Sequence, residues 1–90
     1  MIRDDLKIIL GEEFRLLAIK TRERLNLTQR EMGERLQMSE SSYSDIETGR
    51  SNCGTLTAML LLSFQEDPKA FLNMLNDKFL RWYEREMLTV

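Results

Sequence analysis

The chain has 90 residues, with 13 lysines and arginines against 15 aspartates and glutamates, a formal net charge of -2, and 42% hydrophobic residues. These values indicate one ordered domain with a single core, and they exclude a second domain and a disordered chain. One cysteine and no histidine exclude an intrachain disulfide and a Cys/His zinc site.

Enzymatic activity is not expected from this composition. Histidine, the most frequent general acid or base near neutral pH, is absent, and the sequence has neither a glycine-rich phosphate loop nor a nucleophile elbow. We therefore expect no catalytic site, no cofactor and no metal. The apolar run at residues 8–10 is too short for a signal peptide or a membrane span, so we expect a cytoplasmic protein that does not enter a membrane.

The first helix is predicted over residues 11–25. Apolar or small residues recur there with the three-and-four spacing of one helix face, at Phe14, Leu17, Ala18, Thr21 and Leu25. Residues 1–10 are left open, as either an arm or a short helix in front of it.

The second helix is predicted to begin at about Gln29. Thr28 and Glu31 have the spacing of a capping box, in which the threonine hydroxyl accepts from the third helical amide and the glutamate reaches back to the threonine amide. Met32 and Leu36 then point inward, and a short turn follows at residues 37–38.

The third helix is predicted to be capped by Ser39 and ended by Gly49, with Tyr43 and Ile46 pointing inward. A polar loop spans residues 50–54. Thr55 is expected to cap a fourth, very apolar helix.

A long fifth helix is predicted over residues 68–87. Asp67 and Pro68 have the order of an N-cap followed by proline at the first helical position.

The segment LTQREMGERLQMSESSYSDIETGR at residues 27–50 resembles the Cro/repressor-like (XRE) helix-turn-helix family. The likeness is carried by LTQ at 27–29, MS at 38–39 and IETGR at 46–50, and it extends over about residues 11–66. It implies an all-α, five-helix lambda-repressor-like DNA-binding domain with a long C-terminal helix. The expected organisation is an arm or short helix at 1–10, the helix-turn-helix domain at 11–66 and the C-terminal helix at 67–90.

The resemblance also implies a function, sequence-specific regulation of transcription, in which the third helix enters the major groove of double-stranded DNA. By position, Gln29 resembles a phosphate or base contact, Ser39 and Arg50 phosphate contacts, and Glu40, Ser41 and Asp45 base readers, with Ser42 and Ser44 close behind. Repression through an inverted-repeat operator is the expected role.

Two departures from the family pattern concern the reading helix, where Glu40 and Asp45 replace the usual amides or arginines. Residues 28–50 hold three basic and five acidic residues, a local net charge of -2, so phosphate attraction is weak. The acids either accept hydrogen bonds from cytosine N4 or form a solvated surface on a module that binds protein instead of DNA. Gln37 and Gly33 also depart, standing where glycine and alanine are usual.

The C-terminal helix carries a wide apolar stripe. We predict a homodimer or partner interface at Phe79, Trp82, Tyr83 and Met87; the alternative is that this helix folds back and completes the chain's own core. Residues 53–75 also have a looser likeness to antitoxin-type regulators, which implies a toxin as an alternative partner.

Overall fold

The computed structural model describes residues 2–88. Its five α-helices are α1 (Ile2–Arg24), α2 (Gln29–Arg35), α3 (Glu40–Thr48), α4 (Thr55–Ser63) and α5 (Pro68–Tyr83), and α5 continues into a π-helical turn at Glu84–Leu88. Residues 2–88 contain no strand, so the predicted all-α, five-helix fold is confirmed.

Helix α1 is longer than the sequence pattern predicted. Residues 2–10 are neither an arm nor a separate short helix, because they continue without a break through Gly11 into the expected helix. Asp4 and Asp5 lie in the first turn, where negative charge stabilises the positive end of the helix dipole. The helix ends at Arg24, one residue before the predicted Leu25, and Asn26 follows with a left-handed φ of 55°.

The predicted capping box at the start of α2 is confirmed. The Thr28 hydroxyl accepts from the Glu31 amide at 3.1 Å, and the Glu31 carboxylate accepts from the Thr28 amide at 3.0 Å. These two bonds satisfy two amides that the helix itself leaves without an acceptor. The bond from the Thr28 amide lowers the pKa of Glu31, with a smaller contribution from the Thr28 side chain, because hydrogen bonding to the carboxylate favours its charged form.

The predicted ends of α3 are confirmed as well. The Ser39 hydroxyl accepts from the Ser42 amide at 3.2 Å, and Gly49 ends the helix with a left-handed φ of 80°. A side chain rarely adopts that backbone conformation, which explains the glycine.

One predicted cap is wrong and one is right. Gly54, not Thr55, is the N-cap of α4, so Thr55 is already the first helical residue and makes no capping bond. Burial of Thr57 and Leu61 sets the position of α4, and packing of this kind outweighs the roughly 1 kcal/mol that a capping side chain contributes. At α5 the Asp67 carboxylate accepts from the Ala70 amide at 3.2 Å, as predicted, with Pro68 at the start of the helix.

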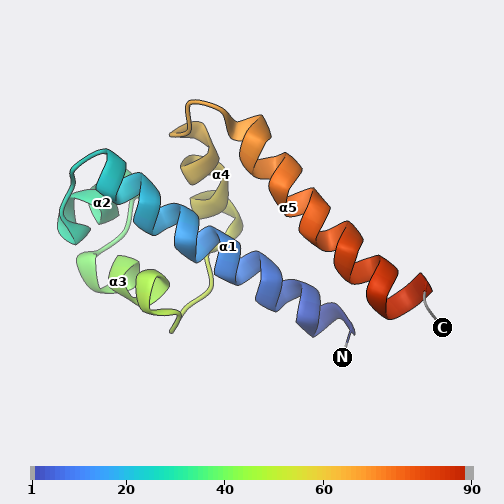
Figure 1. The fold of residues 1–90 in the computed structure, drawn as a ribbon. Coiled ribbons are helices and arrows are strands. Elements are labelled where there is room, and N and C mark those ends of the chain that lie inside the picture. Colours follow the sequence, from blue (N-terminus) through green and yellow to red (C-terminus); the bar gives the residue numbers. More distant parts are fainter. Residues whose placement is uncertain (1, 89–90) are drawn as a thin grey trace.

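The core lies where α1 is surrounded by the other helices. Ala18, Met32, Tyr43 and Leu61 have no exposed surface, and Leu36 has almost none. Helices α2 and α3 gather at the C-terminal half of α1, whereas α5 runs antiparallel to α1, so that the start of α1 and the end of α5 lie on the same side (Figure 1). None of the helices in residues 2–88 is long and apolar enough to cross a membrane.

Helix α5 folds back on α1. The Phe14 and Phe71 rings meet edge to face with centroids 5.0 Å apart, and Lys78 Nζ lies 2.9 Å from the carboxylate of the buried Glu13. Trp82 is only 4% exposed. Trp82 was predicted to contact a partner, and this is wrong, because its indole is already buried within the chain.

The other three predicted interface residues differ in exposure. Phe79 is half-buried against the core, whereas Tyr83 and Met87 are exposed. One face of α5 therefore completes the chain's own core, as the alternative interpretation predicted. The exposed face remains open to a partner.

Candidate nucleic-acid interface

The turn between α2 and α3 is tight because two backbone segments nearly touch. A Cβ atom on Gly33 would lie 3.0 Å from the Met38 carbonyl oxygen and 3.1 Å from that of Ser39. The Met38 amide donates to the Gly33 carbonyl oxygen at 2.9 Å, which closes the turn. Gln37 takes a left-handed φ of 62°, as expected from its place at a position that often has glycine.

A hydrogen-bonded cluster around the Glu47 carboxylate joins α1, α2 and α3. Arg22 of α1 donates through Nε to Oε2 at 2.6 Å and through Nη2 to Oε1 at 3.2 Å. Gln29 of α2 donates to Oε1 at 3.0 Å, and the Tyr43 hydroxyl donates to Oε2. Glu47 is therefore the common acceptor for side chains from all three helices.

Burial and hydrogen bonding shift the pKa of Glu47 in opposite directions. Burial raises the pKa of Glu47, but the bonds from Arg22, Tyr43 and Gln29 outweigh it and hold the pKa below its ordinary value. Burial and the adjacent carboxylate raise the pKa of Tyr43. Glu47 therefore stays charged and Tyr43 stays protonated near neutral pH.

Gln29 was predicted to contact DNA, and in the structure its side chain binds Glu47. Its side chain is half-buried at the first turn of α2, where its amide nitrogen binds Glu47. The sequence carried no signal for the bonds that Gln29 and Tyr43 donate to Glu47. Those bonds join residues 18 and 4 positions apart, across a helix boundary in the first case.

The outward face of α3 holds four of the predicted DNA contacts. Tyr43 and Ile46 are buried against the core, whereas Glu40 and Ser41 in the first turn and Ser44 and Asp45 in the second turn have accessible surface. Glu40 and Ser41 are exposed, and Ser44 and Asp45 are partly covered. The structure thus brings the predicted base-reading residues together on one accessible surface.

The remaining predicted contacts lie at the two ends of α3. At the start, the Ser39 hydroxyl accepts from the Ser42 amide and lies 3.0 Å from the Ser42 hydroxyl. Beyond the end, Arg50 is largely exposed, with Nη1 3.9 Å from the Asp45 carboxylate. A surface ion pair of this kind contributes about 0 to 1 kcal/mol, so Arg50 can exchange Asp45 for another anion.

Two arginines of α1 bind α3 near its C-terminal end. Arg15 donates through Nη1 to the Glu47 carbonyl oxygen at 3.1 Å, near the C-terminal end of α3, where positive charge stabilises a helix. Arg22 forms an ion pair with the Glu47 carboxylate. These two arginines therefore hold α3 in place.

Two consecutive helices, a tight turn and an outward-facing second helix define a helix-turn-helix protein. A family model described as a helix-turn-helix domain matches residues 9–62. Because the match spans more than half of the chain, the chain belongs to this helix-turn-helix family, in agreement with the Cro/repressor-like resemblance of its sequence. Membership indicates a DNA-binding regulator. No curated protein and no solved structure matches the chain significantly.

Proposed function

We propose that this protein is a sequence-specific transcriptional regulator, most simply a repressor, that reads an inverted-repeat operator as a homodimer. The observation that carries the proposal is the outward face of α3. Glu40, Ser41, Ser44 and Asp45 are accessible on a helix that Tyr43 and Ile46 anchor in the core. A reading helix of this kind enters the major groove, which is wide enough to admit it.

The acids on this face support readout of cytosine. A carboxylate accepts but does not donate, and among the major-groove edges cytosine N4 is a donor that it can match. Adenine N6 is the other donor, but its neighbouring N7 acceptor disfavours a carboxylate. Glu40 and Asp45 would therefore select C·G pairs.

Phosphate contacts come from the ends of the helix-turn-helix in this proposal. Arg50 is exposed and held only by a long ion pair, and Ser39 lies at the N-terminus of α3. Gln29 stands at the first turn of α2 with its amide oriented by Glu47. These groups set the position of α3 in the groove, whereas the acids choose the base pairs.

Weak phosphate attraction makes the second copy necessary. Residues 28–50 carry a net charge of -2, and phosphate neutralisation supplies most non-specific affinity. Two reading helices placed about 34 Å apart on one face of the DNA double the specific contacts without adding basic residues. The operator is then an inverted repeat.

Selection from a random duplex library tests the proposal. The purified protein would be incubated with the library at about 50 mM and about 200 mM salt, and the bound duplexes sequenced. An enriched palindrome containing C·G pairs is the expected result, with recovery falling at the higher salt. A library that stays unenriched at the lower salt would contradict DNA reading by this chain.

The same acidic face favours one second candidate, a helix-turn-helix module that binds protein. Five acids against three bases in residues 28–50 would repel DNA but not a basic partner. An antitoxin-type regulator, whose tail binds a toxin, belongs to this alternative. A small toxin-like reading frame beside the gene, together with an unenriched library, would favour it.

A further inference from the structure

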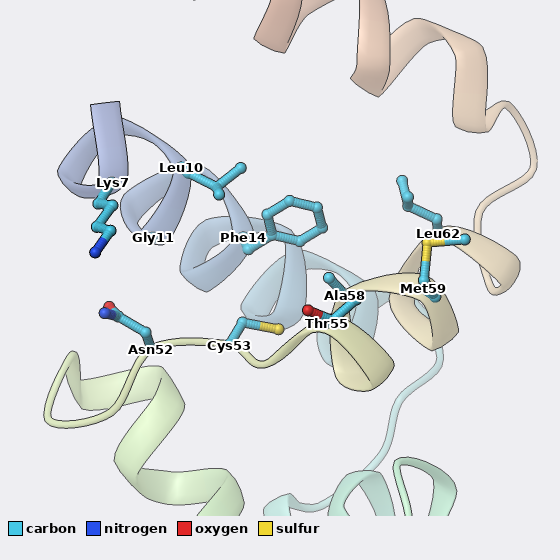
Figure 2. A pocket seen from close by; sticks show the side chains of 10 residues that line it. All are labelled: Lys7, Leu10, Gly11, Phe14, Asn52, Cys53, Thr55, Ala58, Met59 and Leu62. Carbon is cyan, nitrogen blue, oxygen red and sulfur yellow. The ribbon is translucent and has the colours of Figure 1, made fainter. Parts of the chain in front are cut away.

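A groove between α1 and α4 is polar at one end and apolar at the other. Its volume is about 360 Å³, within the range of about 300 to 1,000 Å³ that small-molecule sites usually have. Figure 2 shows Lys7 and Asn52 at one end of the open space, with Phe14, Met59 and Leu62 towards the other. This division favours an occupant that is itself polar at one end and apolar along its body.

The apolar end is formed by side chains from two helices. Leu10 and Phe14 of α1 line it from one side, and Ala58, Met59 and Leu62 of α4 line it from the other (Figure 2). Phe14 is buried, whereas Leu10 is 39% and Met59 58% exposed, so the groove has a floor in the core and rims open to solvent. A small apolar chain lying between the rims would remove both rims and itself from water.

Lys7 and Asn52 come together at the polar end because Gly11 has no side chain. Lys7 and Gly11 are one helical turn apart on the same face of α1, and a Cβ atom on Gly11 would lie 2.9 Å from the side-chain oxygen of Asn52. Figure 2 shows the Lys7 amino group turned towards the Asn52 amide. The two side chains therefore offer an ammonium group and an amide donor to the same ligand group.

The charge at this end suits a carboxylate. Among the described residues that line the groove, Lys7 is the only charged one, so no acid stands there to neutralise it. Burial raises the pKa of the Cys53 thiol to about 11, so Cys53, which lies between the two ends, is uncharged near neutral pH. One lysine balances one carboxylate, whereas a phosphate monoester, with nearly two negative charges, would keep part of its charge unbalanced.

The groove also reaches the loop that follows α3. Asn52 and Cys53 belong to this loop, and the neighbouring Ser51 amide donates to the Asp45 carbonyl oxygen of α3 at 3.1 Å. None of the described residues that line the groove belongs to α2 or α3. An occupant would therefore contact α1, α4 and this loop, and it would leave α3 uncovered.

We propose that the groove between α1 and α4 binds a small amphipathic carboxylate, of the class of medium-chain fatty acids. The carboxylate pairs with Lys7 and accepts from the Asn52 amide, and the apolar chain lies over Phe14 between Leu10 and Met59. The inference goes beyond the proposed function and does not depend on it, because the groove binds its ligand without DNA.

Isothermal titration calorimetry of the full chain with octanoate tests this inference, with octan-1-ol as the uncharged probe of the same chain length. Lys7→Met removes the ammonium group and keeps an apolar stem. Its control is Lys20→Met, at an exposed position of α1 that does not line the groove. Helical content by circular dichroism shows whether each variant is folded.

A second pair of variants tests the apolar end. Met59→Glu places a negative charge on the rim of the groove, at a position exposed enough to accept it without unfolding. Its control is Leu56→Glu, which changes a still more exposed residue of α4 that does not line the groove.

The expected result is one octanoate bound per chain. Its dissociation constant rises by roughly fivefold or more in Lys7→Met and in Met59→Glu, and by less than about twofold in the two controls. Octan-1-ol binds the wild type roughly fivefold more weakly than octanoate does, and binds Lys7→Met as it binds the wild type. Hexanoate binds about tenfold more weakly than octanoate, at about threefold for each methylene group removed from the groove.

Three results would overturn the inference. If octanoate does not saturate the wild type at about 3 mM, the groove does not bind this class of ligand. Equal affinities for octanoate and octan-1-ol, with no effect of Lys7→Met, would show an apolar surface that does not select a carboxylate. An equal effect of Leu56→Glu and Met59→Glu would place the binding elsewhere on α4. Since no DNA is present, each result is independent of the duplex selection that tests operator reading.

Discussion

Glu47 shows how one buried carboxylate can order a reading unit. Its side chain is 8% exposed, and it accepts from Arg22, Gln29 and Tyr43. A buried charge of this kind is favourable only while its partners are in place, because the desolvation of the carboxylate must be offset. The cluster therefore makes the positions of α1, α2 and α3 depend on one another.

Removing this carboxylate should destabilise the fold. Glu47→Ala leaves Arg22 partly buried without its partner, so we expect the free energy of unfolding to fall by about 3 kcal/mol in urea titrations. Glu34→Ala is the matched control, because Glu34 pairs with Arg30 on the surface of α2, and its loss should cost less than about 1 kcal/mol. Similar effects of the two substitutions would contradict the role of Glu47.

The same cluster predicts how stability depends on pH. The folded state holds the pKa of Glu47 below its ordinary value of 4.5, so the cluster stabilises the protein fully above that value and loses this contribution as the pH falls through the lower, folded-state pKa. The stability difference between the wild type and Glu47→Gln should accordingly be constant near neutral pH and shrink in acid. A difference that grows in acid would exclude this explanation.

Glu40 is the residue whose change should alter base preference and little else. It is exposed at the first turn of α3, so Glu40→Ala removes the proposed base contact and a small helix-dipole interaction of about 0.3 to 1 kcal/mol. We expect the selected operator to lose its preference at one base pair of each half-site. Glu34→Ala, on the exposed surface of α2, provides the comparison. A uniform change in affinity for all sequences would argue against direct readout.

At the scale of elements, the turn between α2 and α3 leaves little room for a side chain larger than a methyl group at Gly33. Glycine in a helix interior costs about 1 kcal/mol relative to alanine, yet here it admits the Met38 and Ser39 carbonyl oxygens. The close approach of two backbone segments sets the angle at which α3 leaves α2. The geometry of the reading unit thus follows from this contact.

Gly33→Val should therefore disrupt the turn. A branched side chain would press on backbone atoms only 3.0 Å from its Cβ, and overpacking of this kind costs about 1 to 3 kcal/mol. Thermal unfolding would reveal the loss. Gly33→Ala is the control, because its single methyl needs a shift of a few tenths of an ångström and gains helix propensity in return. A valine variant as stable as the alanine variant would show that the turn is not tightly packed.

At the scale of the whole molecule, α1 and α5 form an antiparallel pair that extends beyond the helix-turn-helix (Figure 1). Trp82, Leu75 and the pair between Glu13 and Lys78 hold them together. The pair leaves one apolar flank of α5 exposed while burying the other face. One helix therefore contributes both to the core and to the exposed surface of the molecule.

Trp82→Ala tests the first of these roles. Truncating a buried tryptophan leaves a cavity, and we expect a loss of about 3 to 5 kcal/mol in unfolding free energy, measured by circular dichroism in urea. Leu56→Ala, at an exposed position of α4 outside the groove, should stay within about 0.5 kcal/mol of the wild type. If Trp82→Ala unfolds like the wild type, α5 is not docked on α1 in solution.

The sequence by itself determined the local features of this protein. Helical periodicity placed Phe14, Tyr43 and Ile46 inside, and the cap residues Thr28 and Ser39 began their helices as predicted, because such signals act between neighbours in the chain. The family pattern also indicated the helix-turn-helix correctly. These features need no knowledge of what lies across the core.

Only the tertiary structure decided the features that depend on distant partners. The Glu47 cluster joins positions 25 and 18 residues apart, and Trp82 is buried because α5 returns along α1. Periodicity showed that α5 has a wide apolar stripe, but not which part of it meets α1 and which part meets solvent. That division is set by packing between helices, and packing is a property of the whole fold.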